Sequence, residues 1–209
     1  DLNKAIELES DNGIALAVRG NVYEEKGEYE KALIDFNKAI ELDPNYDYAL
    51  AGRGYVYKEK EEYDNALVDF NKAIESNPSY VFALAVRGYV YKVKRDYEKS
   101  LIDLNKAIEL DPNYTYTLAL RGDIHGDRGE YEKALIDLNK AIELDPNDAY
   151  ALAGRGYVYE NRGEYDKALI DLNKAIELES DNGIALAVRG NVYEEKGEYE
   201  KALIDFNKA

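Results

Sequence analysis

Arginine and aspartate recur along this chain at fixed intervals, and this is the pattern that comes closest to chemistry. One arginine stands before a glycine in every 34 residues, at Arg19, Arg53, Arg87, Arg121, Arg155 and Arg189. One aspartate recurs with the same period, at Asp35, Asp69, Asp103, Asp137, Asp171 and Asp205. A catalytic site needs one convergent set of groups, whereas this pair occurs six times. We therefore predict a bidentate structural ion pair in each copy, and no active site.

The single histidine, His125, gives no support for catalysis or for a metal centre. The chain has no cysteine, so thiolate zinc sites and disulfides are excluded. No serine or cysteine lies in a pattern that would pair with His125 as a nucleophile. We expect His125 to fill a tyrosine-sized space between helices, and we expect a non-enzyme without cofactors.

Acidic turns such as Glu41-Leu42-Asp43-Pro44-Asn45 raise the possibility of calcium binding. The alternating oxygen ligands and central glycine of an EF-hand loop are missing, however, and no glycine-rich phosphate loop is present. We interpret these turns as solvated helix ends. Proline ends one helix, and the asparagine that follows it is expected to cap the next.

The elements that carry these residues are repeated helix pairs. Within one 34-residue unit, apolar residues from Ala15 to Tyr23 and from Tyr29 to Ile40 follow three- and four-residue steps, which is helical spacing. Gly27 lies between the two runs and suits a helix end. Each unit is thus predicted to be two antiparallel helices of about 13 residues. We expect one array over 1–209, with a partial repeat at 1–12, repeats at 13–46, 47–80, 81–114, 115–148 and 149–182, and an incomplete repeat at 183–209.

A glycine occupies one mid-helix position in all six units. The glycines are Gly20, Gly54, Gly88, Gly122, Gly156 and Gly190. Glycine in a helix costs about 1 kcal/mol relative to alanine, so a close approach of a neighbouring backbone is expected at each. The expected partners are the small residues Ala32, Ala66, Ser100, Ala134, Ala168 and Ala202.

This pattern resembles the tetratricopeptide repeat family over essentially the whole chain. Its signature of a large residue, Gly and Tyr, then Ala, an aromatic, Ala and Pro, is matched at Leu16, Gly20, Tyr23, Ala32, Phe36, Ala39 and Pro44. The departures are leucine at the family's tryptophan position, His125 in place of Tyr, Ser10 and Ser180 in place of Pro, and Glu61 and Arg95 in place of the turn glycine. The resemblance implies an all-α, right-handed superhelical solenoid of antiparallel hairpins, whose first helices line a concave groove.

The resemblance also indicates which positions face that groove. The second position of the unit supplies Tyr48, Phe82, Tyr116 and Tyr150, and the ninth supplies Tyr55, Tyr89, Tyr157, Asn21 and Asn191. Exposed aromatics on a concave surface are typical of recognition sites, although packing between adjacent helices would also explain some of them. The fifth position is always alanine, such as Ala17 and Ala51, which is expected to give the groove a roomy floor. A clamp for a C-terminal carboxylate is not expected, because the lysine that such clamps carry there is absent.

The net charge of −16 limits the partners. Nucleic acid and anionic membranes both require basic residues, so neither is expected. A protein or peptide with apolar, aromatic or cationic character is easier to accommodate, although the acidic excess also serves solubility. No apolar run of about 18 residues suggests a membrane span. We therefore expect a soluble protein, with the cytoplasm favoured.

Residues 171–209 repeat residues 1–39 letter for letter. This identity indicates a recent duplication of a five-unit block, or deliberate construction, within a piece of a longer array. It also leads us to expect the same groove surface at 14–25 and 184–195, which favours multivalent binding. We predict a protein-interaction scaffold that binds a peptide or partner protein in the groove. The alternative is a structural spacer or a module that self-associates end to end, and regulation of an enzyme domain elsewhere is a more remote possibility.

Overall fold

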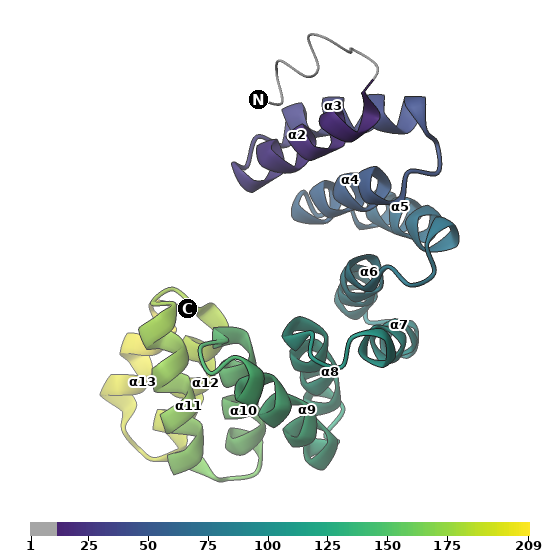
Figure 1. Ribbon diagram of the computed structural model, residues 1–209. Helices are drawn as coiled ribbons and strands as arrows, with labels where there is room; N and C mark the ends of the chain where they lie inside the picture. The colour runs from purple at the N-terminus through teal and green to yellow at the C-terminus, as the bar shows by residue number, and fades with distance from the viewer. Residues whose placement is uncertain (1–11) are drawn as a thin grey trace. The chain divides into compact units, whose positions relative to one another are not determined.

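The computed structural model describes residues 12–209, which form twelve α-helices. The chain divides into two compact units on either side of the Leu110–Asp111 bond, and we describe each unit by itself. Each unit consists of three successive helix hairpins (Figure 1). The predicted all-α solenoid of hairpins is confirmed. The partial repeat expected at 1–12 lies, except for Asn12, outside the described residues.

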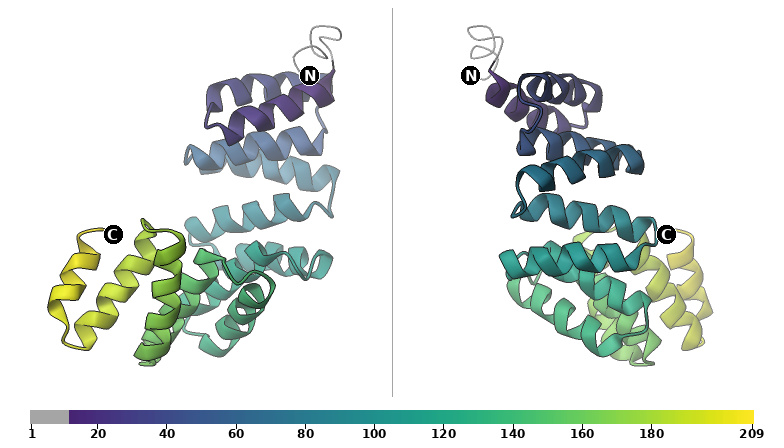
Figure 2. Two further views of the ribbon diagram at one scale, coloured as in Figure 1. Left: turned by 60° about the vertical axis from the view of Figure 1, so that its left-hand side comes forward. Right: turned by 90° about the vertical axis from the view of Figure 1, so that its right-hand side faces the viewer.

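The first helix of each hairpin is called an A helix here, and the second a B helix. In the first unit the hairpins are α2 (Gly13–Glu25) with α3 (Tyr29–Leu42), α4 (Asp47–Glu59) with α5 (Tyr63–Ser76), and α6 (Val81–Val93) with α7 (Tyr97–Leu110). In the second unit they are α8 (Thr115–Asp127) with α9 (Tyr131–Leu144), α10 (Ala149–Asn161) with α11 (Tyr165–Leu178), and α12 (Gly183–Glu195) with α13 (Tyr199–Phe206). The two helices of a hairpin lie side by side and antiparallel (Figure 2).

The turn between the helices of each hairpin contains one residue with positive φ. Four of these residues are glycines, with φ between +71° and +76°, at Gly27, Gly129, Gly163 and Gly197. The other two are Glu61 and Arg95, both with φ of +60°. The left-handed conformation is unfavourable for residues with a Cβ, so these two turns are strained where the other four are relaxed.

The loops between hairpins place the cap differently from the sequence expectation. Asn45 does not cap α4, since its backbone N–H donates to Asp43 Oδ1 at 3.0 Å and closes the turn. Side-chain caps occur instead one residue later in the repeat, where Asn12, Asp148 and Asn182 each accept a hydrogen bond at 2.9 Å from the backbone N–H three residues on. The acidic residue of the turn therefore satisfies a backbone donor.

Each A helix packs against its own B helix and against helices of the adjacent hairpins in the same unit. In the first unit α4 contacts α2 and α6 as well as α3, and in the second α10 contacts α8 and α12 as well as α9. The core consists of residues that fill these junctions, and Phe36, Leu50, Phe70 and Leu84 in the first unit are at most 1 % exposed. A helices therefore carry apolar residues on more than one side.

The nearest neighbour of the mid-helix glycines is a large side chain and not the small residue that was expected. A Cβ on Gly20 would lie 2.9 Å from Phe36 Cε1. A Cβ on Gly122 would lie 2.7 Å from Leu138 Cγ, and the backbone oxygen of Ala134 would be the second contact at 3.2 Å. The predicted small partner does lie close at two glycines, since Ser100 Oγ donates to the Gly88 carbonyl oxygen at 2.6 Å and Ala134 borders Gly122, but it is the nearest neighbour at none. Glycine is required because the ring or leucine of the B helix lies against the A helix at this point.

The predicted ion pairs are confirmed in all six hairpins. In each, the arginine Nε and Nη2 donate to the two carboxylate oxygens of the aspartate at 2.6–2.8 Å. For four arginines, Nη1 also donates to an asparagine of the preceding B helix, as Arg53 does to Asn37 at 2.6 Å. The guanidinium thus joins the two helices of its hairpin and also joins one hairpin to the previous one.

Candidate functional site

The A helices of the first unit enclose a cavity of about 460 Å³. Its walls come from three A helices and the loop before α6, namely Asn21, Glu24 and Glu25 of α2, Tyr48, Gly52 and Tyr55 of α4, Phe82 of α6, and Tyr80. We call it the acidic aromatic cavity. Four of the residues predicted from the sequence, Asn21, Tyr48, Tyr55 and Phe82, are brought together here. The volume lies within the range of roughly 300–1,000 Å³ that is typical of ligand pockets.

Aromatic rings form one side of this cavity and support one another. The ring of Phe82 lies 5.7 Å from that of Tyr55 and 6.1 Å from that of Tyr80, both in tilted geometry. Tyr48 is paired in the same way with Tyr46, at 6.1 Å. The rings of the cavity are half-buried, so each is held in place and still presents a face to a ligand.

Carboxylates form the other side of the cavity, and their negative charges repel one another. Burial raises the pKa of Glu24, and the negative charges of Glu59 and Glu25 raise it further. Burial also raises the pKa of Tyr48, with contributions from Glu25 and Glu24. In the described residues no hydrogen bond or ion pair is formed by the Glu24 carboxylate, whereas Glu25 accepts a hydrogen bond from Asn21 at 3.3 Å. The cavity therefore has a negative potential that its own side chains do not fully balance.

Lys58 of α4 lies beside Tyr55, and aromatic rings hold its ammonium group. Its Nζ lies 4.5 Å from the ring centroid of Tyr55 and 5.2 Å from that of Tyr89, and it forms an ion pair with Glu59. Burial acts to raise the pKa of Glu59, but the ion pair with Lys58 and the hydrogen bond from Tyr55 outweigh it and lower that pKa. Tyr89, predicted as a groove residue, thus contacts Lys58 and does not line the cavity.

In the second unit the predicted residues are placed differently. Tyr150 donates a hydrogen bond to the Asp123 carboxylate, so this acid already has a donor. Tyr157 is half-buried beside Gly126, and a Cβ on that glycine would lie 3.7 Å from the Tyr157 ring. Tyr116 is paired with Tyr114 at 6.1 Å, and Asn191 is exposed. The assignment of Tyr116, Tyr150, Tyr157 and Asn191 to a groove therefore stays a prediction.

The groove floor expected from the fifth position is wrong. Ala17, Ala51, Ala85 and Ala119 have no exposed surface and Ala153 is 1 % exposed, and of the six only Ala187 is partly exposed. The fifth position lies beneath the surface because it faces the neighbouring helices. Gly52, at the sixth position, borders the cavity instead. The sequence feature that could have indicated the cavity is therefore Gly52, which stands at the sixth position where most other units carry valine or leucine.

Sequence reasoning also missed three wall residues, Glu24, Glu25 and Tyr80. The two acids lie at positions that the family resemblance assigns to the concave face, and their identity carries the charge of the cavity. Tyr80 precedes its A helix, in a segment expected to be a loop. Tyrosine recurs at this place as Tyr46 and Tyr114, and that recurrence could have indicated a structural role.

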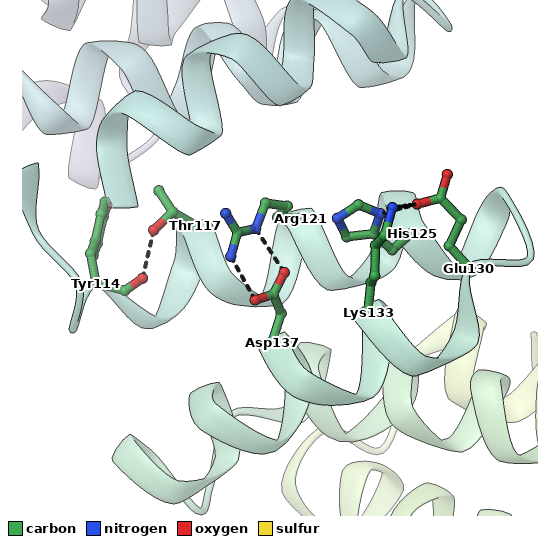
Figure 3. A network of polar contacts seen from close by, with 7 residues as sticks. All are labelled: Tyr114, Thr117, Arg121, His125, Glu130, Lys133 and Asp137. Atoms are coloured by element: carbon green, nitrogen blue, oxygen red, sulfur yellow. Dashed lines mark hydrogen bonds and ion pairs between the residues drawn. The ribbon is translucent and has the colours of Figure 1, made fainter. Parts of the chain in front are cut away.

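His125 belongs to a local polar network with Glu130 and Lys133. Its Nδ1 lies 3.0 Å from Glu130 Oε2, and Glu130 also accepts from Lys133 at 2.8 Å (Figure 3). The hydrogen bond from Lys133 is the main reason that the pKa of Glu130 is lowered, and the charges of His125 and Arg128 add to it. The side chain of His125 is 13 % exposed, in agreement with the expected packing position. Over residues 12–209 no group of three or more acidic or histidine side chains could hold a metal ion.

No helix within residues 12–209 combines the length and hydropathy that crossing a bilayer requires.

Comparison with known proteins gives one consistent result. Family models described as tetratricopeptide repeat match residues 14–46, 48–80, 83–114, 149–182 and 185–209, and one described as TPR repeat matches residues 122–163. A search of curated proteins found no match.

Among solved structures, YrrB, described as a TPR protein with an unusual peptide-binding site, is 32 % identical, with a TM-score of 0.65, over 89 % of this chain and 96 % of its own. A tetratricopeptide repeat protein from Parabacteroides merdae is 25 % identical, with a TM-score of 0.77, over 99 % of this chain and 82 % of its own. A chain of the APC/C hetero-tetramer Cut9–Hcn1 is 17 % identical with a TM-score of 0.91, over 99 % of this chain and 41 % of its own, and shows the fold alone.

Proposed function

The chain belongs to the tetratricopeptide repeat family, whose repeats mediate interactions between proteins, and we propose that its A helices bind a peptide segment of a partner protein. One observation carries this proposal: the cavity of about 460 Å³ is lined by residues of three successive A helices. A segment that follows these helices would contact all three at once.

The character of the surface supports a peptide over a compact small molecule. The aromatic rings of Tyr48, Tyr55 and Phe82 come from two neighbouring A helices, so apolar contact is available along the array and not at one point. Tyrosine and phenylalanine contribute large contact areas at low conformational cost, and they are enriched at the centres of protein interfaces. The similarity to YrrB, itself described as having a peptide-binding site, points in the same direction.

A selection experiment tests the proposal. A library of random dodecapeptides displayed on phage is selected on the immobilised chain, and enriched peptides are measured by fluorescence anisotropy. We expect enriched peptides to lose at least about tenfold in affinity for a Tyr55→Ala, Tyr89→Ala, Tyr157→Ala variant, because hot-spot aromatics contribute about 2 kcal/mol or more. An Ile34→Ala variant serves as the control, since Ile34 is 67 % exposed on a B helix. Undiminished binding to the triple variant, with helical content preserved by circular dichroism, rules out this surface.

A second candidate function, end-to-end association, is favoured by a separate observation. Phe36 is fully buried, whereas Phe206 of the identical sequence segment is 40 % exposed and Leu203 is 61 % exposed. An exposed apolar face of this kind can be covered by another chain. Light scattering of the 209-residue chain over a range of concentrations tests this, and a constant monomer mass excludes it.

A further inference from the structure

The acidic aromatic cavity combines two features that together select for a positive charge. Glu24 and Glu25 face it from α2, and Tyr48, Tyr55, Tyr80 and Phe82 face it from α4, α6 and the preceding loop. No lysine or arginine is among its lining residues in the described part of the chain. Carboxylates attract a cation directly, and aromatic faces attract it through the ring quadrupole.

The structure contains an internal example of the same contact. The Lys58 ammonium lies over the rings of Tyr55 and Tyr89 and pairs with Glu59, so a carboxylate and two rings already hold one cation at the edge of this region. A lysine lies over a tyrosine in four hairpins as well, at 5.2–5.4 Å from the ring centroid. Ammonium on tyrosine is therefore a recurring interaction of this chain, and Tyr48 and Phe82 offer further rings for it.

The Glu24 carboxylate is the acid best placed to gain from a ligand cation. It is half-buried and makes no ion pair in the described residues, while Lys58 is engaged with Glu59. Its pKa is raised by burial and by the charges of Glu59 and Glu25 and is lowered to a smaller extent by Lys58, so a ligand cation would offset the repulsion from the two neighbouring carboxylates. Charge complementarity therefore decides what kind of side chain fits.

We propose that the acidic aromatic cavity is a specificity pocket for a basic side chain, lysine or arginine, of the bound peptide. The inference rests on the proposed function, because it names the chemistry of the ligand at the same surface. The aliphatic stem of the basic residue packs on Tyr55 and Phe82, and its charged end reaches Glu24 and Glu25.

The second unit provides a natural contrast at the positions that correspond after three repeats. Tyr150, Gly154 and Tyr157 match Tyr48, Gly52 and Tyr55, so part of the aromatic wall is present. Glu24 is replaced there by Gly126, however, and Phe82 by Ile184. Two acids are present there: Asp127 at the place of Glu25, and Asp123, at the place of Asn21, which accepts a hydrogen bond from Tyr150. Selection for a basic side chain is therefore assigned to the first unit.

The test uses two small probes that differ in charge but hardly in shape, N-acetyl-arginine methylamide and N-acetyl-citrulline methylamide. Each is titrated into the full chain and followed by the NMR signals of the tyrosine and phenylalanine rings. We expect the arginine probe to bind about tenfold more tightly than the citrulline probe and to shift ring signals that the Phe82→Leu variant loses. A Glu24→Gln, Glu25→Gln variant should remove the preference. The control Asp123→Asn, Asp127→Asn, which removes the same number of acids from the corresponding region of the second unit, should keep it.

Equal binding of the two probes to the unaltered chain overturns the inference. So does a preference for arginine that persists in the Glu24→Gln, Glu25→Gln variant, because general attraction by the acidic surface would then explain it. The proposed function fails separately: it falls if the displayed peptides bind the triple tyrosine variant undiminished, whatever the probes do. Enriched peptides that depend on the tyrosines but contain no basic residue would refute the inference alone.

Discussion

Gly52 and Gly154 occupy equivalent places in α4 and α10, and the structure predicts opposite results when each is changed to alanine. A Cβ at position 52 would lie 2.5 Å from Cζ and 2.6 Å from Cε1 of Phe36, whereas a Cβ at position 154 would lie 3.2 Å from Cδ2 of Leu138. Phe36 is fully buried, so its rigid ring has no free space into which to move. Leu138 needs to shift by only a few tenths of an ångström.

The magnitude follows from two opposing terms. Overpacking a core costs about 1–3 kcal/mol, and the short contact in Gly52→Ala places it at the upper end. Replacing glycine by alanine within a helix returns about 1 kcal/mol. We therefore expect Gly52→Ala to lower the free energy of unfolding by about 2 kcal/mol, and Gly154→Ala to leave it unchanged or to raise it by up to about 1 kcal/mol.

Urea unfolding followed by circular dichroism measures both changes. Because a repeat array can unfold in parts, amide hydrogen exchange of α3 and α4 should locate the loss in Gly52→Ala to that junction. Adding Phe36→Leu provides the second check, since leucine is the residue found beside Gly154. The double variant should lose less free energy of unfolding than the sum of the losses of the two single variants. Equal effects of the two glycine substitutions, or no positive coupling with Phe36→Leu, would show that the contact is not what makes Gly52 necessary.

Three further changes test other parts of the structure. Glu61→Gly should stabilise the chain by about 1 kcal/mol in urea unfolding, because glycine adopts the positive φ at this position without the strain that a Cβ causes. Gly163→Ala should destabilise the chain by a similar amount, because it introduces a Cβ at a positive φ. Asp69→Asn should lower the free energy of unfolding by about 3 kcal/mol in the same assay, because it leaves the half-buried Arg53 guanidinium without its anion. A loss below about 1 kcal/mol would contradict a bidentate pair. Glu24→Gln should stabilise the chain at pH 7 but not at pH 3.5. The folded-state pKa of Glu24 is raised, so the stability it contributes is present below its unfolded value of about 4.3 and is lost as the pH rises through the folded value.

The hairpins and their ion pairs could be predicted because they depend on short-range spacing. A period of 34 residues with three- and four-residue steps defines two helices, and the antiparallel turn then brings Arg53 and Asp69 opposite each other. The overall amino-acid composition adds little to the prediction of the ion pair, since arginine and aspartate at this spacing would pair with each other among many different surrounding residues. Repetition itself was the strongest signal, because six copies exclude a unique catalytic use.

Side-chain direction could not be predicted from the same spacing. The glycine at position 20 was matched with the small Ala32, whereas the Phe36 ring is what contacts it. The fifth-position alanines were expected at the surface although they are buried. In both cases the residue type correctly indicates close packing, but the periodicity does not say which neighbour fills the space.

The cavity shows why a repeated sequence is not a repeated site. Tyr150, Gly154 and Tyr157 of the second unit repeat Tyr48, Gly52 and Tyr55, yet Gly126 and Ile184 stand where Glu24 and Phe82 line the cavity.

The cavity is assembled from separate hairpins, since α2 supplies the acids whereas Tyr48, Tyr55, Tyr80 and Phe82 follow α2 in the chain and supply the aromatic wall. The same surface expected at 14–25 and 184–195 stays a prediction, since the site depends on the hairpins that follow each segment as well as on the segment itself. In this cavity one A helix supplies the carboxylates, and the next two A helices supply the aromatic rings. Ligand specificity is thus a property of consecutive repeats taken together, and changing the order of repeats would change it as surely as changing a residue.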